Sequence, residues 1–219
     1  MQATRLEVHR RYNGSMSTLP RFEVDMLPRT FVVEPPMSDA ELEAFCLRND
    51  IAQVERTREG VIRMNAPAGW DTTRANSEIS GRLFAWWSKH RRGQVVADSS
   101  GGFYLHDGSM LSPDAAYILP ETQKKIAKGK RDGFCPVCPD FVIELLSRSD
   151  SLAATQAKME RWIANGVQLG WLIDPYQQKV SIYRPGFETV LFAGKRLKGI
   201  GPVEGFNLDL GGVWQYYHD

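Results

Sequence analysis

The sequence predicts an α/β fold built on a small mixed β-sheet with a parallel central pair, flanked by helices. Two apolar runs, residues 140–146 and 169–174, are typical of strands buried on both faces. Between them, residues 152–165 carry apolar side chains at helical spacing. A strand, a helix and a second strand in this order form a right-handed crossover, which makes the two strands parallel neighbours.

The composition is that of a soluble globular protein. The 219 residues fit one domain. We expect residues 1–35 to form an N-terminal extension, because they show no clear period, and residues 36–219 to form the domain. The formal net charge of +1 lacks the strongly basic character usual in nucleic-acid binders, but it is compatible with an enzyme that has a local basic groove.

Neither a membrane segment nor a secretory leader is expected. No stretch approaches the roughly 18 apolar residues of a membrane span, and the first residues lack a basic segment followed by an apolar core. The three cysteines, an odd number, argue against a disulfide framework. We therefore expect a cytoplasmic protein without a membrane partner.

The first elements of the domain are a short helix and a hairpin. Ser38 and Glu41 have the spacing of a capping box, which predicts a helix to about residue 48. Alternating polarity around a glycine turn then predicts two paired strands, over 51–57 and 61–64.

A long helix follows, with Asp71 or Thr72 as its cap and Gly93 as its stop. Its apolar stripe contains Ile79, Leu83, Trp86 and Trp87. The remaining expected elements are strands over 94–97, 102–105 and 113–119, a polar surface segment over 121–133, a strand over 179–184 antiparallel to its predecessor, and an extended segment over 205–210.

Glu144 is the most informative residue because it is a carboxylate inside a buried apolar strand. An ionised carboxylate there is costly unless it is paired, hydrogen-bonded or bound to a metal. Asp114 opens another apolar strand, and Lys158 lies on the helix that follows Glu144. Two carboxylates and a lysine around adjacent strand ends are the parts of a metal-dependent phosphodiesterase.

The chemistry of phosphodiester hydrolysis explains why these residue types are needed. A hard divalent cation offsets the charge of the phosphate and lowers the pKa of bound water. Mg²⁺ takes oxygen ligands and one or two carboxylates, so Asp114 and Glu144 would hold Mg²⁺ or Mn²⁺, with the carbonyl of Leu145 as a third ligand. Lys158 would extend toward the attacking water or the phosphate, and Glu78 could contact the metal directly or through water.

Several stretches, in order, resemble the PD-(D/E)XK nuclease superfamily with its restriction-endonuclease-like fold, and more specifically the Uma2 family, also called DUF820. The resemblance covers roughly residues 38–212. It is carried by Asn-Ser-Glu-Ile-Ser-Gly-Arg-Leu at 76–83, Ala-Asp-Ser-Ser-Gly-Gly-Phe at 97–103, Ser-Pro-Asp-Ala at 112–115, Cys-Pro-Asp-Phe-Val-Ile-Glu-Leu at 138–145, Ser147, Ser-Asp-Ser-Leu at 149–152, Gln156, Lys-Met at 158–159, Asn-Gly-Val at 165–167 and Leu-Gly-Trp-Leu-Ile-Asp-Pro at 169–175.

The resemblance implies a Mg²⁺- or Mn²⁺-dependent endonuclease acting on DNA. Asp114 and Glu144 match the two catalytic carboxylates, and Glu78 falls where many members carry a glutamate on the first core helix. The superfamily lysine, two residues after the second carboxylate, is replaced by Leu146. Lys158 looks like a migrated substitute, because a long lysine can reach the same point from a helix packed on the strand. Pairing of superfamily members suggests a homodimer by analogy.

Other interpretations remain open from the residues alone. Glu144 could pair with a buried cation without any catalytic role, and Glu78 could form an exposed helix pair with Arg82. The chain could be a non-catalytic nucleic-acid- or protein-binding domain that retains the fold, which the near-neutral charge and Leu146 favour. A weaker alternative is a phosphoesterase acting on RNA or a small nucleotide.

Overall fold

The computed structural model describes residues 30–49, 53–65, 67–96, 100–126 and 133–217, together with the backbone of residues 4–6. The fold is α/β, as predicted. The strands of the described part form two six-stranded sheets and one two-stranded sheet. No helix among these residues is both long and apolar enough to cross a membrane.

The central sheet contains the predicted parallel pair. Strands β9 (Phe141–Leu145) and β10 (Leu169–Asp174) are parallel, and Glu144 stands opposite Leu172. The helix α4 (Leu152–Ala164) connects them, which confirms the crossover. Antiparallel strands extend the sheet on both sides in the order β12-β11-β10-β9-β8-β5, with β5 at Gln94–Val96, β8 at Ala115–Ile118, β11 at Lys179–Tyr183 and β12 at Val190–Phe192.

A second sheet contains the predicted hairpin of β3 (Gln53–Arg56) and β4 (Val61–Asn65). Residues 30–33, which we assigned to the N-terminal extension, form β2 (Thr30–Val33) and pair with β4, because Phe31 and Val33 are buried in the core beneath this sheet. The second sheet therefore includes a strand from the range that we assigned to the extension. The order is β1-β2-β4-β3-β7-β6, with β1 at Thr4–Leu6, β6 at Phe103–Tyr104 and β7 at Met110–Leu111.

The predicted cap of the first helix is confirmed, whereas the long helix has other residues at its ends. In α1 (Asp39–Arg48), Ser38 and Glu41 form the expected capping box, and the Ser38 N–H donates to Glu41 Oε2 over 2.9 Å. The long helix α2 (Trp70–His90) begins one residue before the predicted caps, because Gly69 occupies the cap position without a side-chain hydrogen bond. Its last residue is His90, and the C-terminal cap is Arg91, which adopts the left-handed conformation with φ of 48°.

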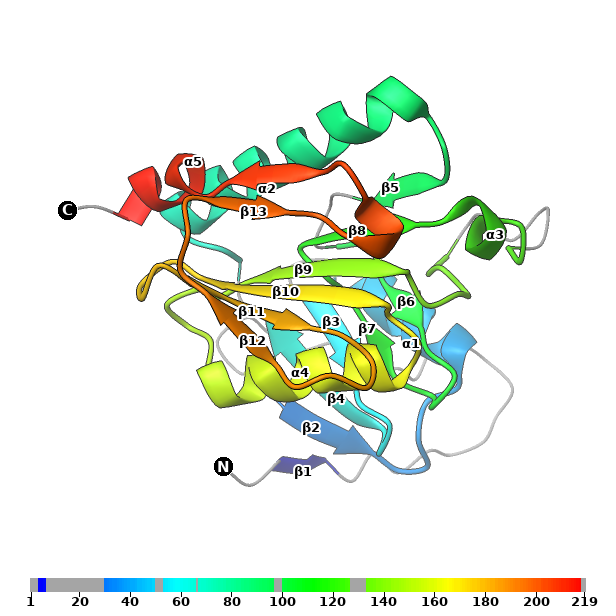
Figure 1. Cartoon of the computed structure of the whole chain (residues 1–219). Coiled ribbons are helices and arrows are strands. Elements are labelled where there is room, and N and C mark those ends of the chain that lie inside the picture. The colour runs from blue at the N-terminus through cyan, green and yellow to red at the C-terminus, as the bar shows by residue number, and fades with distance from the viewer. Residues whose placement is uncertain are drawn as a thin grey trace.

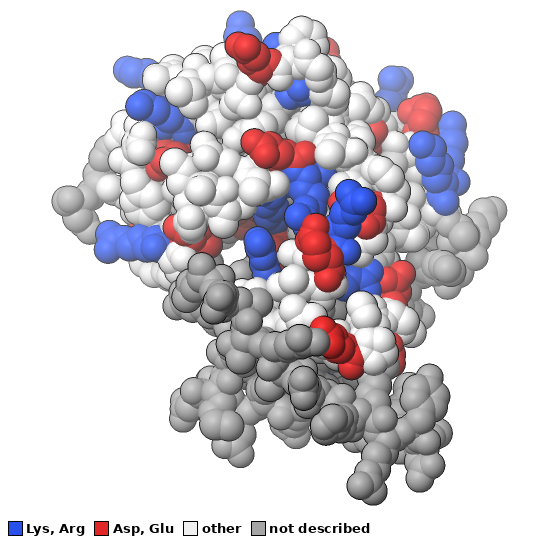
Figure 2. Space-filling view, turned by 90° about the horizontal axis from the view of Figure 1, so that it is seen from below, with Lys and Arg blue, Asp and Glu red and all other residues white. Residues whose placement is uncertain are grey.

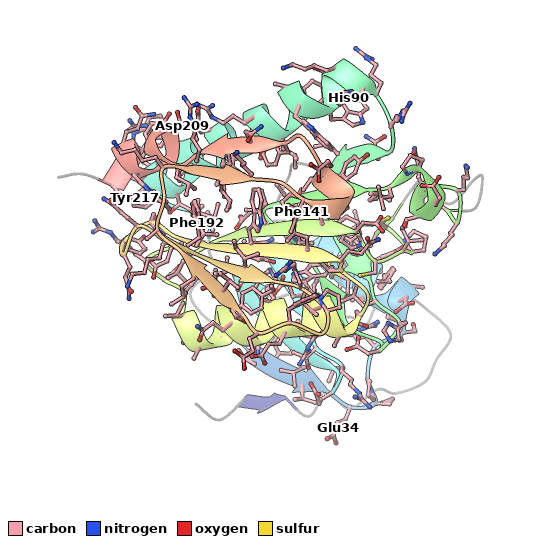
Figure 3. The ribbon with its side chains drawn as sticks, viewed as in Figure 1. Glu34, His90, Phe141, Phe192, Asp209 and Tyr217 are labelled. Carbon is pink, nitrogen blue, oxygen red and sulfur yellow. The ribbon has the colours of Figure 1, made fainter. Side chains whose placement is uncertain are left out.

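The central sheet is covered on both faces (Figure 1). One face carries α2 and the hairpin of β13 (Arg196–Lys198) and β14 (Asn207–Asp209). Phe141 points into this layer (Figure 3), where its ring meets Trp171 edge-on at 4.9 Å. The remaining helical segments are short: α3 at Pro120–Gln123, α5 at Gly211–Trp214, and the 3-10 turns Gly201–Val203 and Gln215–Tyr217.

The opposite face of the central sheet carries α4 (Figure 1), whose buried side chains share one core with residues of both sheets. Buried Met159 and Trp162 of α4 pack with Val142 of the central sheet and Phe103 of the second sheet. The helix can approach β10 closely because position 170 is glycine; a Cβ there would collide with the Met159 side chain. This close packing brings α4 side chains to the strand that carries Glu144.

Candidate active site

Glu144 points from β9 toward α4. Phe141, Ile143 and Leu145 belong to the core on the α2 side, whereas Val142 and Leu146 belong to the core on the α4 side. The alternation of a strand therefore directs Glu144 to α4. Its side chain is buried, and Oε1 accepts a 2.8 Å hydrogen bond from Nε1 of Trp162.

Lys158 of α4 meets Glu144 in an ion pair. Its Nζ lies 2.9 Å from Oε1 and 3.0 Å from Oε2 of Glu144. The structure thus brings together the lysine and the second carboxylate that the sequence singled out. Leu146, at the superfamily's lysine position, is 7% exposed and packs in the apolar core instead.

Two further acceptors surround the same ammonium. Nζ of Lys158 lies 2.8 Å from Oε1 of Glu55 on β3, and it donates to the carbonyl of Ser112 over 2.7 Å. Glu55 and Ser112 are both buried. The sequence analysis did not identify Glu55, because its partner lies in a different sheet and no local spacing connects the two.

Asp114 stands directly before β8, at the same end of the sheet. Ala115 pairs with Ile143, so extending this antiparallel register by one residue places Asp114 opposite Glu144. Oδ2 of Asp114 accepts a 2.7 Å hydrogen bond from the N–H of Leu145. The N–H and C=O of a strand residue point to the same side, so the Leu145 carbonyl also faces Asp114, as a metal ligand there would require.

The helix α2 contributes Asn76 to this cluster. Nδ2 of Asn76 donates to Oδ1 of Asp114 over 2.9 Å. Its own Oδ1 is buried and has no hydrogen-bond partner within the described part of the chain. Asn76 could have been identified from the sequence, because it precedes the core residue Ile79 by about one helical turn.

Glu78 lies apart from the cluster. A helix turns about 100° per residue, so Glu78 points away from the side of α2 that presents Asn76. Glu78 pairs with Arg82 over 2.5 Å and lies against Gly212 of α5. Among the described residues, no contact joins it to Asp114, Glu144 or Lys158, so the structure does not bring this predicted ligand to the site.

The protonation of the cluster follows from burial and from close charges. Burial raises the pKa of Glu144 to about 8, against the opposing effect of Lys158, and the charges of Asp114 and Glu55 add to the rise. Burial also raises the pKa of Asp114. Burial alone would lower the pKa of Lys158, but Glu144 and Glu55 outweigh it and raise that pKa, so the ammonium stays charged.

The oxygen atoms of the cluster suit a hard divalent cation. Asp114 and Glu144 offer carboxylate oxygens, and the orphaned Oδ1 of Asn76 and the Leu145 carbonyl are neutral oxygens beside Asp114. An ionised carboxylate has about four lone-pair sites, so the existing hydrogen bonds leave capacity for a cation. No group of three or more His, Cys, Asp or Glu with metal-binding geometry occurs among the residues with described placement. A cation here would therefore use a carboxylate pair and complete its shell with other oxygens, as Mg²⁺ commonly does.

Comparisons with known proteins agree with this fold. The Uma2 family model, described as "Putative restriction endonuclease", matches residues 39–211. A solved structure from Anabaena variabilis, titled as a "putative nuclease belonging to DUF820", matches with a TM-score of 0.63 and 21% identity over 74% of this chain and 90% of that chain. No curated protein gave a significant match. Because the family model spans well over half of the sequence, the chain belongs to the Uma2 family of restriction-endonuclease-like proteins.

Proposed function

We propose that the chain is a metal-dependent endonuclease that hydrolyses phosphodiester bonds in DNA. The observation that carries the proposal is the ion pair between Lys158 and Glu144, with Asp114 opposite Glu144 at the end of the same sheet. Family membership supports it, because the family model is described as "Putative restriction endonuclease".

Each residue of the site would have a distinct role in this reaction. Asp114, Glu144 and the Leu145 carbonyl would hold Mg²⁺ or Mn²⁺, with Asn76 as an additional oxygen donor. The cation would supply positive charge for the leaving oxygen and a bound water of lowered pKa. Lys158 would then orient the attacking water or a phosphate oxygen.

Lys158 cannot take that role without exchanging a partner. An ammonium has three hydrogens to donate, and Glu55, Glu144 and Ser112 accept them in this structure. Glu144 is the partner that it would release, because a cation competes for the same carboxylate oxygens. The lysine would stay beside the site through its two other contacts.

The mixed surface charge is compatible with a substrate that contacts only a small part of the surface. Figure 2 shows Lys and Arg side chains intermingled with Asp and Glu near the middle of one face, without a uniform basic field. This pattern agrees with the formal net charge of +1. Binding of DNA should therefore depend on a few phosphate contacts, and its affinity should fall only modestly as salt increases. A homodimer remains a prediction, which light scattering of the purified chain would test.

The test is cleavage of supercoiled plasmid with Mg²⁺ or Mn²⁺, and with EDTA. We expect nicking by the wild-type chain, none in EDTA, and none by Glu144→Gln. Glu160→Gln, an exposed carboxylate on α4, is the matched control and should cleave normally. Full activity in Glu144→Gln would refute the proposed site.

A binding domain that retains the nuclease fold is the second candidate, and Leu146 at the superfamily's lysine position favours it. Binding of DNA without cleavage under any metal condition would support it. Cleavage of RNA or a small nucleotide, but not of plasmid, would instead support phosphodiester hydrolysis with a substrate other than DNA.

A further inference from the structure

Glu55 reaches the site from the other sheet. It lies on β3 of the second sheet, whereas Glu144 lies on β9 of the central sheet, and Lys158 of α4 contacts both. Glu55 is 4% exposed, and its Oε1 lies 2.8 Å from Nζ of Lys158. A buried carboxylate at this distance from an ammonium restricts where the ammonium can lie.

A single oxygen of Glu55 makes two contacts. Oε1 also accepts a 3.0 Å hydrogen bond from the N–H of Ser112, while the carbonyl of Ser112 accepts from Lys158 over 2.7 Å. Glu55, Ser112 and Lys158 therefore form a closed ring of hydrogen bonds. Ser112 lies two residues before Asp114, so this ring connects the lysine to the strand that carries the first carboxylate.

We propose that Glu55 is a positioning residue that holds Lys158 at the active site independently of Glu144. The inference rests on the proposed function, in which the oxygens of Glu144 would be needed for a cation. A lysine on a helix has a long, flexible stem, so it needs a second anchor once its first carboxylate partner is occupied. Glu55 and Ser112 provide that anchor.

Two substitutions separate the hydrogen bonds of Glu55 from its charge. In Glu55→Gln the amide oxygen can replace Oε1 and still accept from Lys158 and Ser112. In Glu55→Ala both hydrogen bonds are lost. Glu59→Ala is the matched control, because Glu59 lies on the same hairpin and its side chain is 63% exposed.

The first readout is the ¹H–¹⁵N signal of the Lys158 ammonium, identified by its loss in Lys158→Met. A buried ammonium with three hydrogen-bond partners exchanges its hydrogens slowly enough to be observed. We expect the signal in the wild type, in Glu59→Ala and in Glu55→Gln, and its loss in Glu55→Ala. An unchanged signal in Glu55→Ala would overturn the proposal.

The second readout is the sign of a stability change. Glu55→Gln should lower the unfolding midpoint of the wild type, because Lys158 loses a charged partner. It should raise the midpoint of Lys158→Met, in which Glu55 is a buried charge without its cation. A lower midpoint in both backgrounds would show that Glu55 acts apart from Lys158, and the proposal would fail.

The third readout is plasmid cleavage. Glu55→Ala should lower kcat by about 100-fold with little change in KM, the scale expected for a misplaced catalytic group, and Glu55→Gln should recover most of it. A chain whose wild type cleaves nothing would contradict the proposed function, while the ammonium signal would still decide whether Glu55 positions Lys158.

Discussion

Nε1 of Trp162 donates a 2.8 Å hydrogen bond to Oε1 of Glu144, the same oxygen that lies 2.9 Å from Nζ of Lys158. Lys158 and Trp162 lie one turn apart on α4, so consecutive turns of one helix hold one carboxylate oxygen. The tryptophan is fully buried, and its ring meets Phe103 edge-on at 6.1 Å. It therefore fixes the orientation of Glu144 as well as filling the core.

Trp162→Phe should lower the free energy of unfolding, because it removes the donor to Glu144 as well as ring volume. Hydrogen bonds to charged groups contribute about 1.5–3 kcal/mol. Trp171→Phe, at a buried tryptophan on the opposite face of the sheet, measures the loss of ring volume and ring contacts without a hydrogen bond to a carboxylate. Urea unfolding should show the larger loss for Trp162→Phe; equal losses would mean that the indole hydrogen bond contributes nothing.

Lys158→Met should destabilise the fold by about 3–5 kcal/mol, because removing one partner of a buried ion pair leaves charges uncompensated. Glu144 and Glu55 are the carboxylates left behind. Adding Glu144→Gln to Lys158→Met should restore part of the stability, as measured by denaturant unfolding. A double variant less stable than Lys158→Met would argue against charge as the cause.

The contribution of Glu144 to the stability of the metal-free protein should fall as pH rises from about 4.5 to about 8. The pKa of Glu144 rises from 4.5 to about 8 on folding, chiefly through burial. In that pH window the folded state binds more protons than the unfolded state, so the free energy of unfolding decreases with pH. Glu144→Gln removes this contribution, and urea unfolding at several pH values should show a flatter profile for the variant. An identical slope in both proteins would contradict the raised pKa.

Asn76→Ala should weaken Mn²⁺ binding, and Glu78→Gln should not. Asn76 donates to Asp114, and its buried Oδ1 has no hydrogen-bond partner among the residues that the structure describes, whereas Glu78 contacts Arg82. Calorimetric titration with Mn²⁺ measures the affinity directly, without relying on cleavage. Ser77→Ala, an exposed neighbour on α2, is the control. Loss of binding in Glu78→Gln alone would reinstate Glu78 as the ligand.

The sequence predicted those contacts of the site that lie within one strand and the helix that follows it. Glu144 and Lys158 lie on one strand–helix crossover, whose geometry follows from the apolar pattern. Glu55 could not be predicted in this way, because its contact with Lys158 depends on how two sheets pack around a helix.

The position of Glu78 shows that a family resemblance can indicate a helix without indicating which of its residues contacts the site. The resemblance indicated Glu78 on α2, but the residue of α2 that contacts Asp114 is Asn76, on another side of that helix. Which α2 residue contacts Asp114 depends on the direction in which each side chain leaves the helix. The apolar stripe through Ile79, which faces the core, indicates these directions. The long helix likewise begins at Trp70, before the predicted polar caps, because a glycine can occupy the cap position.

The core that α4 shares with both sheets has a consequence for how the molecule unfolds. Separation of the sheets would expose Met159 and Trp162 to water and would break the contact between Lys158 and Glu55 in the same event. The two sheets should therefore lose structure together, and the amide hydrogens of α4 should exchange with solvent only through global unfolding. An intact site then indicates that both sheets and α4 are folded together.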